Sequence, residues 1–277
     1  MPEPETAAIE ADHELLIGAV REAGARALEL FGTGVRQWKK PDGTPVSHAD
    51  IVVDEVLKER LVGGRPGYGW LSEETLEAAD LSRPGRVWVV DPIDGTRAFL
   101  RGAPHWSVSV ALVEDARPVA AAVFNPATGQ LFEAVAGRGA RLNGEPIRAS
   151  QRDELAGARI LVQDHALRSR RWREPWPELQ SEMRNSIAYR LCLVASGEFD
   201  ALISMNPKSA WDLAAGDLIV AEAGGMATTH DGRPFVYDRA YGGFPNVAAA
   251  GPGLHAELVR RTGAATIARR SRQETRG

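Results

Sequence analysis

A continuous apolar run that ends on two carboxylates is the part of this chain best suited to chemistry. Val87-Trp88-Val89-Val90 leads to Asp91, and Asp94 follows three residues later. The run predicts a buried strand, and Pro92, which cannot donate a hydrogen bond to a neighbouring strand, predicts that the strand ends there. Two carboxylates so close together repel one another unless a divalent cation or a shared proton neutralises them. Gly95-Thr96 then predicts the first turn of a helix, whose free N–H groups attract an anion. A cation site beside an anion site indicates chemistry on a phosphate.

Two distant segments also end or begin with acidic residues beside apolar ones. Trp70-Leu71-Ser72 leads to Glu73-Glu74, far enough before Asp91 for a loop and a return in a neighbouring strand. Trp211-Asp212 opens a stretch with helical apolar spacing that runs to Gly224-Gly225, where a helix should end. Each segment alone also has a structural interpretation. The glutamates could form a solvated loop, Asp212 could complement a helix dipole, and D-x-x-D-G-T could be a turn with a helix cap.

Taken together, the three segments closely resemble the inositol monophosphatase superfamily of magnesium-dependent, lithium-sensitive phosphatases. That superfamily carries a Glu-Glu pair, then D-P-[IL]-D-G-T, then W-D followed by small residues and a Gly-Gly helix end, and all three occur here in the same order. The resemblance extends from about residue 10 to about residue 260. It implies a phosphoric monoester hydrolase with the fold of a five-layer αβαβα sandwich, and a site between the two halves of that sandwich.

The resemblance also implies a set of metal ligands. Glu73, Asp91 and the backbone carbonyl of Ile93 would hold one Mg²⁺, and Asp91, Asp94 and Asp212 would hold a second, with Asp91 bridging the two. Magnesium prefers oxygen ligands in octahedral geometry and retains some water. A pair of such ions can activate a nucleophile and stabilise the leaving oxygen of an in-line displacement.

The same resemblance assigns roles to the residues around these ligands. The N–H groups of Gly95 and Thr96 would bind the phosphate, and Glu73 together with Thr96 would position and deprotonate the attacking water. Glu74 would lie in an outer position or hold a weaker third metal ion.

An upstream loop from Lys39 to Asp50 resembles the lysine-containing loop of the family that ends in T-x-x-D. Ser47, with Asp50 three residues later, predicts a capping box at the start of a helix that continues from Ile51 to Leu61. Asp50 would also face the metal site through water. Either Lys39 or Lys40 is expected to reach the solvent at the metals; we favour Lys40, although the spacing permits both.

Two alternatives remain open at this point. Haloacid-dehalogenase-type phosphatases also place D-x-D-G-T after an apolar strand and use the first Asp as a covalent nucleophile. Here, however, two residues separate Asp91 from Asp94, and about ninety residues precede the motif. A non-catalytic binding module in the same fold would gain nothing from the intact carboxylates, because an unneutralised cluster weakens a fold that binds no metal. Neither a G-x-x-x-x-G-K-[ST] loop nor a G-x-G-x-x-G turn occurs.

The sequence defines the substrate less well. Inositol-specific members carry an acidic residue six positions before W-D, where this chain has Met205, which cannot accept hydrogen bonds from sugar hydroxyls as a carboxylate does. Arg190 stands where the bisphosphate nucleotidase branch tends to place a Lys, and it is either a phosphate contact or a surface helix arginine. The basic run from Arg168 to Arg173, which includes Trp172, could contact a second phosphate and stack on a base, or be a solvated loop. These features favour 3′-phosphoadenosine 5′-phosphate over inositol monophosphate and leave histidinol phosphate and sugar bisphosphates open.

Composition indicates a soluble cytoplasmic enzyme. The 277 residues can bury a large core, and a net charge of −4 provides no general attraction to nucleic acid or to an anionic membrane. No apolar stretch approaches the length of a transmembrane helix, and the acidic first residues are unlike a signal peptide. The single Cys192 lies in an apolar helical context, where we expect it to be buried. We expect a homodimer that acts on a small phosphorylated metabolite.

The pattern of apolar residues predicts an α+β half, residues 1–150, followed by an α/β half, residues 151–277, in one compact unit. The first half should carry most metal ligands, and the second should contribute Asp212 and the substrate contacts. Expected helices run from Thr6 to Phe31, Ser47 to Leu61, Ser186 to Ala195 and Trp211 to Ala223. Expected strands run from Tyr68 to Ser72, Arg86 to Asp91, Trp106 to Val113, Pro118 to Phe124, Gln130 to Val135, Ala158 to Val162 and Ala201 to Ser204.

Overall fold

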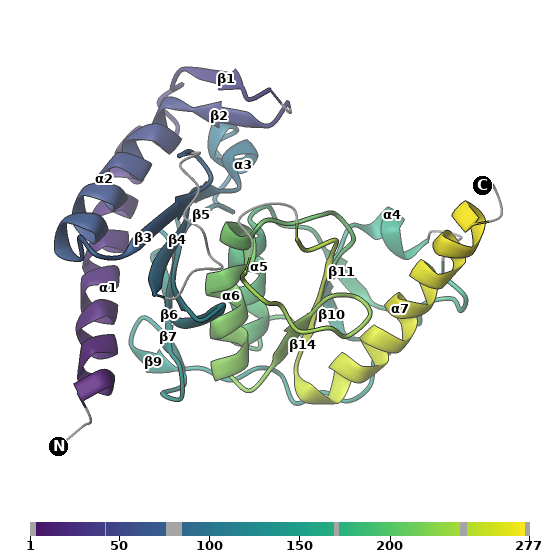
Figure 1. The fold of residues 1–277 in the computed structure, drawn as a ribbon. Coiled ribbons are helices and arrows are strands. Elements are labelled where there is room, and N and C mark those ends of the chain that lie inside the picture. Colours follow the sequence, from purple (N-terminus) through teal and green to yellow (C-terminus); the bar gives the residue numbers. More distant parts are fainter. Residues whose placement is uncertain (1–3, 42, 76–84, 169–171, 239–242, 275–277) are drawn as a thin grey trace.

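Helices and two sheets stack in five alternating layers across the molecule (Figure 1). The computed structural model describes residues 4–41, 43–75, 85–168, 172–238 and 243–274. Within this part of the chain, one helical layer covers the outside of each sheet, and a third lies between the sheets. The layered α+β sandwich that the sequence predicts is therefore confirmed.

The larger sheet has the strand order β3-β4-β5-β6-β7-β8-β9 in the described chain. β3 and β4 are parallel, and every later neighbour pair is antiparallel. The parallel pair matters for the site because parallel strands end at the same edge of a sheet. The strands are β3 (Gly69–Ser72), β4 (Arg86–Asp94), β5 (Ser107–Glu114), β6 (Arg117–Asn125), β7 (Gln130–Val135), β8 (Ala140–Leu142) and β9 (Glu145–Pro146).

The smaller sheet has the order β11-β10-β12-β14-β13. β10 is parallel to β11 and to β12, whereas β14 is antiparallel to β12 and to β13. A separate antiparallel hairpin, β1 with β2, projects beside α3 in Figure 1. These strands are β1 (Gln37–Lys39), β2 (Pro45–Ser47), β10 (Arg159–Leu161), β11 (Gln180–Glu182), β12 (Ala201–Ser204), β13 (Met226–Thr228) and β14 (Val247–Ala250).

The helices fill the three remaining layers. α1 and α2 pack on the outer face of the larger sheet, α5 and α6 lie between the sheets, and α7 packs on the outer face of the smaller sheet (Figure 1). Short helices α3 and α4 follow β4 and β10 in the chain. The helices are α1 (Pro4–Leu30), α2 (His48–Gly64), α3 (Thr96–Leu100), α4 (Asp164–Leu167), α5 (Ile187–Ala195), α6 (Ala210–Glu222) and α7 (Pro252–Glu274).

Side chains of β4 alternate between two hydrophobic cores. Trp88 and Val90 pack in the core formed with α1 and α2, whereas Val87 and Val89 pack in the core formed with α5 and α6. The alternation follows from the two-residue period of a strand. It directs the next residue of the second set, Asp91, toward the α5–α6 layer.

Every helix and strand expected from the sequence is present, with ends displaced by a few residues. The prediction that the strand ends at Pro92 is wrong, because β4 continues to Asp94. α7 was not predicted, since few of its residues, Leu254 and Leu258 among them, anchor it in the core beside the smaller sheet. Cys192 is buried and unpaired, as expected.

The two halves expected from the sequence correspond to the two sheets only in part. The larger sheet ends before residue 150 and the smaller sheet begins after it. One continuous core, however, joins α5 and α6 to residues of both sheets. The division into two halves therefore remains an interpretation.

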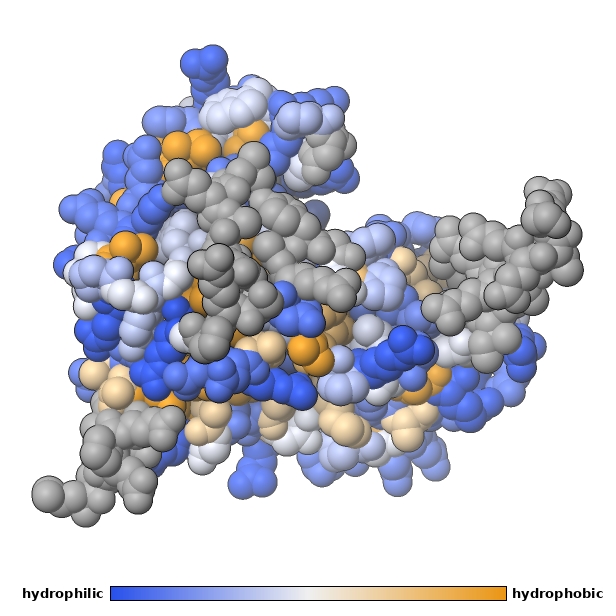
Figure 2. All heavy atoms as spheres, viewed as in Figure 1, coloured by the Kyte–Doolittle hydropathy of each residue, from blue (hydrophilic) through white to orange (hydrophobic). Residues whose placement is uncertain are grey.

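The surface seen from the side of Figure 1 is mostly hydrophilic, with apolar residues in small scattered groups (Figure 2). It is hollowed beside the β1–β2 hairpin in the same view. None of the described helices combines the length and the apolar character needed to cross a bilayer.

Candidate active site

The register of the parallel pair β3–β4 places Glu73 beside Asp91. Ser72 pairs with Val90, and the N–H of Glu73 donates to Val90 O at 3.1 Å, which extends the ladder by one residue. Leu71 packs in the same core as Val89, so the alternation of side chains places Glu73 on the face that carries Asp91. The return to a neighbouring strand, which the sequence predicts, is confirmed.

A β-bulge brings Asp94 to the same face as Asp91. Asp91 pairs with Ser109 and Asp94 pairs with Ser107, so β4 has one residue more than β5 between these two pairs. In a regular strand, residues three apart face opposite sides; the extra residue reverses this and turns Asp94 toward Asp91. Pro92 is tolerated there because the pairing is already interrupted, and a residue without an N–H loses nothing at a bulge. This explains why the strand passes through the proline.

Asp212 reaches the cluster from the first turn of α6, which packs against β4. It forms a capping box with Ser209, whose N–H donates to Asp212 Oδ2 at 2.6 Å. Asp91, Asp94 and Asp212 each offer a carboxylate oxygen, and these oxygens lie within 4.8 Å of one another. The capping role of Asp212 is therefore real, and it leaves the other carboxylate oxygen available to the cluster.

Mutual repulsion and burial raise the pKa values of these carboxyl groups. Burial raises the pKa of Asp91 well above its ordinary value, and the charges of Glu73, Asp94 and Asp212 add to the shift. Burial also raises the pKa of Asp94, although the hydrogen bonds that its carboxylate accepts from Ser186 and Ala188 act to lower it. The pKa of Asp212 rises to about 7, first because of burial and then because of Asp94. The three groups cannot all ionise near neutral pH without a cation.

The hydrogen bonds of the cluster leave oxygens for such a cation. Asp91 Oδ1 is buried and has no hydrogen-bond partner. Asp94 Oδ2 accepts bonds from Ser186 Oγ at 2.6 Å and from Ala188 N at 2.7 Å, which orient the carboxylate without saturating it. A buried acceptor without a donor is costly, and a divalent cation bound by carboxylate oxygens would satisfy it. The donor set therefore suits a hard divalent metal.

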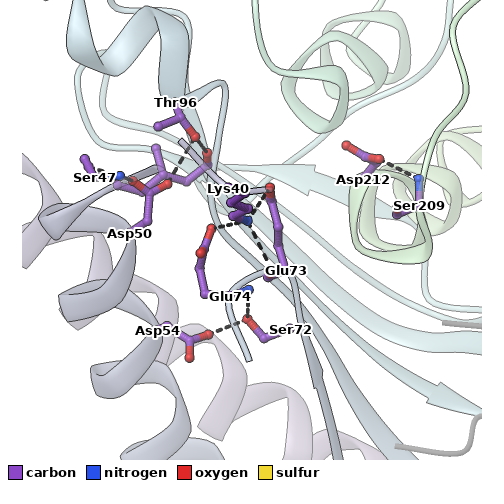
Figure 3. A network of polar contacts seen from close by, with 11 residues as sticks. Lys40, Ser47, Asp50, Asp54, Ser72, Glu73, Glu74, Thr96, Ser209 and Asp212 are labelled. Atoms are coloured by element: carbon purple, nitrogen blue, oxygen red, sulfur yellow. Dashed lines mark hydrogen bonds and ion pairs between the residues drawn. The ribbon is translucent and has the colours of Figure 1, made fainter. Parts of the chain in front are cut away.

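Lys40 joins the two glutamates on the other side of the site (Figure 3). Its Nζ donates to Glu73 Oε1 at 2.9 Å, to Glu73 O at 3.2 Å and to Glu74 Oε1 at 2.7 Å. Lys39, by contrast, lies on β1 and is exposed, so of the two candidate lysines Lys40 is the one at the site. Glu73 is not one of the three close carboxylates. Burial raises the pKa of Glu74 to about 7, although Lys40 opposes the shift.

The hydroxyl of Thr96 lies between two acceptors, 3.1 Å from Asp50 Oδ1 and 3.1 Å from Ile93 O. Asp50 is buried, and its Oδ2 accepts a bond from Ser47 N at 2.8 Å, which is one of the two bonds of the predicted capping box. The same oxygen accepts a further bond from Ser47 Oγ at 2.6 Å. Burial raises the pKa of Asp50 to about 6 despite these bonds. A carboxylate of this pKa bonded to a hydroxyl can accept a proton near neutral pH.

Gly95 connects β4 to α3 in the left-handed conformation, with φ of 94°. A Cβ on this residue would lie 3.0 Å from His105 O and 3.1 Å from Ser186 N, so both the positive φ and the close backbone contacts require glycine. The first intrahelical bond runs from Ala98 N to Gly95 O at 2.7 Å. The N–H groups of Gly95 and Thr96 therefore precede the helical ladder, where donors remain for an anion.

The structure tests the burial of the proposed substrate contacts. Arg190 is buried, so its interpretation as a surface helix arginine is wrong. Burial lowers its pKa to about 10, and the charges of Asp94 and Asp212 oppose that shift. Its Nε donates to Ser186 O at 3.3 Å, and its Nη1 contacts Met183 Sδ at 3.7 Å. Met205 packs beside the core of the smaller sheet.

The basic run from Arg168 to Arg173 lies partly outside the described residues, since residues 169–171 are not among them. Trp172 contacts Trp176 edge to face, with ring centroids 5.3 Å apart, and its indole N–H donates to Ala166 O at 2.6 Å. This ring therefore has partners in its own loop and in α4.

Sequence reasoning missed two residues of the site. Ser186 caps α5 and also donates to Asp94, and a serine before a helical apolar run is a signal that could have found the cap. Lys208 lies near Asp212, whose charge opposes the lowering of the lysine pKa by burial. Its Nζ donates to Asn206 O and Pro207 O, and no pattern in the sequence indicates that this lysine lies close enough to Asp212 to feel its charge.

A model described as the inositol monophosphatase family matches residues 9–265. The chain belongs to this family. It is 36% identical over 228 residues to an inositol-1-monophosphatase of Rhizobium meliloti (strain 1021), an alignment that covers 79% of this chain and 85% of that protein. It is 39% identical over 204 residues to a histidinol-phosphatase of Mycobacterium tuberculosis (strain ATCC 25618 / H37Rv), an alignment that covers 70% of this chain and 77% of that protein. The crystal structure of the extragenic suppressor protein SuhB from Bartonella henselae is similar, with a TM-score of 0.79, 27% identity, and 90% and 97% of the two chains covered.

Membership of the inositol monophosphatase family defines the class of reaction. Proteins of the family are metal-dependent phosphatases that act on small phosphorylated compounds. The chain is therefore a phosphoric monoester hydrolase, as the sequence predicts, and the haloacid-dehalogenase-type alternative is set aside.

Proposed function

We propose that this protein is a Mg²⁺-dependent phosphomonoesterase whose metals bind at the cluster of Asp91, Asp94 and Asp212. The observation that carries the proposal is the convergence of three carboxylates from β4 and α6, one of which has a buried oxygen, Asp91 Oδ1, that receives no hydrogen bond. Oxygen-only ligands favour Mg²⁺ over softer metals.

The proposed assignment of ligands uses two ions. Glu73, Asp91 and the carbonyl of Ile93 would hold the first, and Asp91, Asp94 and Asp212 would hold the second. When bound, Mg²⁺ would neutralise the carboxylates, polarise the phosphate and lower the pKa of water. Glu74 and Lys40 would stay outside this set, with Lys40 balancing the charge of the glutamates.

The chain itself would bind the phosphate and move a proton. The N–H groups of Gly95 and Thr96, which precede the α3 ladder, would bind the phosphate. The Thr96 hydroxyl, bonded to Asp50 at 3.1 Å, would take the proton of the attacking water as it passes its own proton to that carboxylate. Glu73 would orient the same water. No group of the protein would form a covalent intermediate.

For the substrate we propose 3′-phosphoadenosine 5′-phosphate. Arg190 and Lys208 place two buried or partly buried positive charges near Asp94 and Asp212, which would suit a substrate with a second anionic group. Met205 supplies no acceptor for sugar hydroxyls. The names of the relatives keep inositol 1-phosphate and histidinol phosphate as second candidates.

A substrate panel tests this proposal. We expect phosphate release with Mg²⁺, and a higher kcat/KM for 3′-phosphoadenosine 5′-phosphate than for inositol 1-phosphate or histidinol phosphate. Arg190→Gln should lower kcat/KM for the bisphosphate by about tenfold or more, the equivalent of one charge-assisted hydrogen bond, and should change the value for a monophosphate much less. A preference for inositol 1-phosphate, or an equal loss for both substrates, would contradict the substrate proposal and leave the metal proposal standing.

The homodimer, the sensitivity to lithium and the cytoplasmic location expected from the sequence stay predictions. Light scattering during size-exclusion chromatography measures the first. A titration of activity with Li⁺ at fixed Mg²⁺ measures the second.

A further inference from the structure

Asp54 is a buried carboxylate of α2 that contacts the segment on which Glu73 and Glu74 lie. It is 6% exposed. Its Oδ1 accepts a hydrogen bond from Ser72 Oγ, and its Oδ2 accepts one from Thr75 Oγ1 at 2.6 Å. Figure 3 shows Asp54 beneath the segment, on the helix side.

The two hydroxyls bonded to Asp54 belong to the residues on either side of the glutamate pair. Ser72 immediately precedes Glu73, and Thr75 immediately follows Glu74. Ser72 Oγ also accepts a bond from the N–H of Glu74 at 3.2 Å. Both ends of the segment are thus tied to a single carboxylate.

The remaining bonds of this segment come from other directions. The N–H of Glu73 donates to Val90 O on β4 at 3.1 Å. Lys40 Nζ binds the carboxylates of both glutamates and, at 3.2 Å, the carbonyl oxygen of Glu73. Neither contact fixes the turn after Ser72, because the ladder stops at Glu73 and a lysine side chain is flexible. Asp54 is the contact from the rigid helix that closes this turn.

We propose that Asp54 is a positioning residue, which holds the Glu73–Glu74 segment in the orientation that metal binding needs. The inference rests on the proposed function, because Glu73 as a metal ligand is part of that proposal. Groups that orient a metal ligand through hydrogen bonds affect metal affinity by about 10–100-fold when they are removed. Asp54 acts through Ser72 and Thr75 and does not itself contact the metal cluster.

The test measures Mg²⁺ binding by calorimetry, together with kcat and the Mg²⁺ concentration for half-maximal activity. In the native protein the hydroxyls of Ser72 and Thr75 each donate to a different oxygen of Asp54. Asp54→Asn keeps the shape of the side chain but leaves only one acceptor oxygen for the two hydroxyls. We expect Mg²⁺ affinity to fall about tenfold or more, while kcat at saturating Mg²⁺ falls much less. Thr75→Val, which removes one of the two bonds and leaves the charge of Asp54, should show a smaller loss of the same kind.

Asp12 provides a matched control. It is a buried aspartate of α1 that accepts bonds from Tyr68 Oη and Arg86 Nη1, both at 2.8 Å, and from Arg65, none of which is in the site. Asp12→Asn should lower the melting temperature and leave Mg²⁺ affinity unchanged. Failure of the native protein to bind Mg²⁺ would overturn the proposed function and this inference with it.

A different result would refute the inference but not the proposed function. In that case the native protein binds Mg²⁺, and Asp54→Asn binds it equally well but has a lower melting temperature. Asp54 would then stabilise the fold, as Asp12 does, without positioning the metal ligands. Should Asp54→Asn not fold, Thr75→Val and Ser72→Ala decide the matter by the same measurement. Native Mg²⁺ affinity in both of these variants would refute a positioning role.

Discussion

Replacing Asp212 with Asn should raise the stability of the metal-free protein and reduce the stabilisation that added Mg²⁺ provides. The side chain of Asn keeps an acceptor for the N–H of Ser209, which Asp212 Oδ2 now binds at 2.6 Å, so the helix cap survives. What the substitution removes is the negative charge beside Asp91 and Asp94. Without a cation that charge destabilises the fold, whereas in the proposed site it is needed to bind the second Mg²⁺.

The magnitude without metal follows from the raised pKa. A pKa of about 7 in place of the ordinary 3.8 means that ionising Asp212 at pH 8 weakens the metal-free fold by up to about 4 kcal/mol. Loss of the charge at the start of α6 costs only about 0.3–1 kcal/mol in the other direction. Metal-free Asp212→Asn should therefore melt several degrees higher than the native protein at pH 8, at roughly 2 °C per kcal/mol for a chain of this size.

The magnitude with metal follows from binding. Mg²⁺ at a hundred times its dissociation constant stabilises the native protein by about 2.7 kcal/mol for each site, and the variant should lose the contribution of the second site. Turnover should fall by at least ~100-fold, since removal of one group that stabilises developing charge has this effect. Melting curves at pH 8 with EDTA and across a Mg²⁺ titration, together with kcat, measure both effects.

An Asp212 that only complements the helix dipole predicts a different pattern. The melting temperature would then fall slightly and equally with and without Mg²⁺, and kcat would remain near the native value. Such a result would refute the placement of Asp212 among the metal ligands and weaken the link between the three acidic segments.

Three further predictions concern the whole site. Chelation by EDTA should abolish phosphate release and Mg²⁺ or Mn²⁺ should restore it, whereas equal activity in EDTA would contradict the metal proposal. Single turnover in ¹⁸O-labelled water should place the label in the released phosphate and none in Asp91; a phosphoaspartate trapped by rapid quench would instead show covalent catalysis. The metal-free protein should lose stability as the pH rises from about 4 to about 7, because the pKa values of Asp50, Asp212 and Asp217 are raised in the folded state from 3.8 to about 6, 7 and 7. Added Mg²⁺ should offset most of this loss in a series of melting temperatures, and Asp217→Asn, outside the cluster, should reduce the slope without changing the effect of Mg²⁺.

The sequence predicted the placement of Glu73 and Asp91 because it depends on local rules. Alternation within the apolar run determines the face of Asp91, and a second apolar run ending on an acidic residue suggested a neighbouring strand. Glu73 then lies beside Asp91 wherever the two strands pair in register. The capping box predicted at Ser47 is likewise local, since a hydroxyl and an acidic residue three positions later are enough to form it. The same pattern at Ser209 and Asp212 forms a capping box that was not predicted.

The bulge of β4 could not be predicted in this way. Pro92 shows that one donor is missing, but it does not show whether pairing resumes after it. Pairing resumes here because Asp94 meets Ser107 of β5, a partner that only the tertiary structure reveals. A strand that ended at Pro92 would have left Asp94 in a loop without a defined direction.

Burial of Arg190 is a consequence of the layer order, and it bears on the substrate. Every residue of α5 is buried, because the helix lies between two sheets and has no face toward solvent. A guanidinium enclosed in this way needs opposite charge, and the carboxylates acting on it are Asp94 and Asp212. Divalent cations at the same carboxylates would leave the positive charge of Arg190 in excess, and an anionic group of the bound substrate would restore the balance. In the proposed function that group is a second phosphate, and the comparison of a bisphosphate with a monophosphate in the substrate panel tests this assignment.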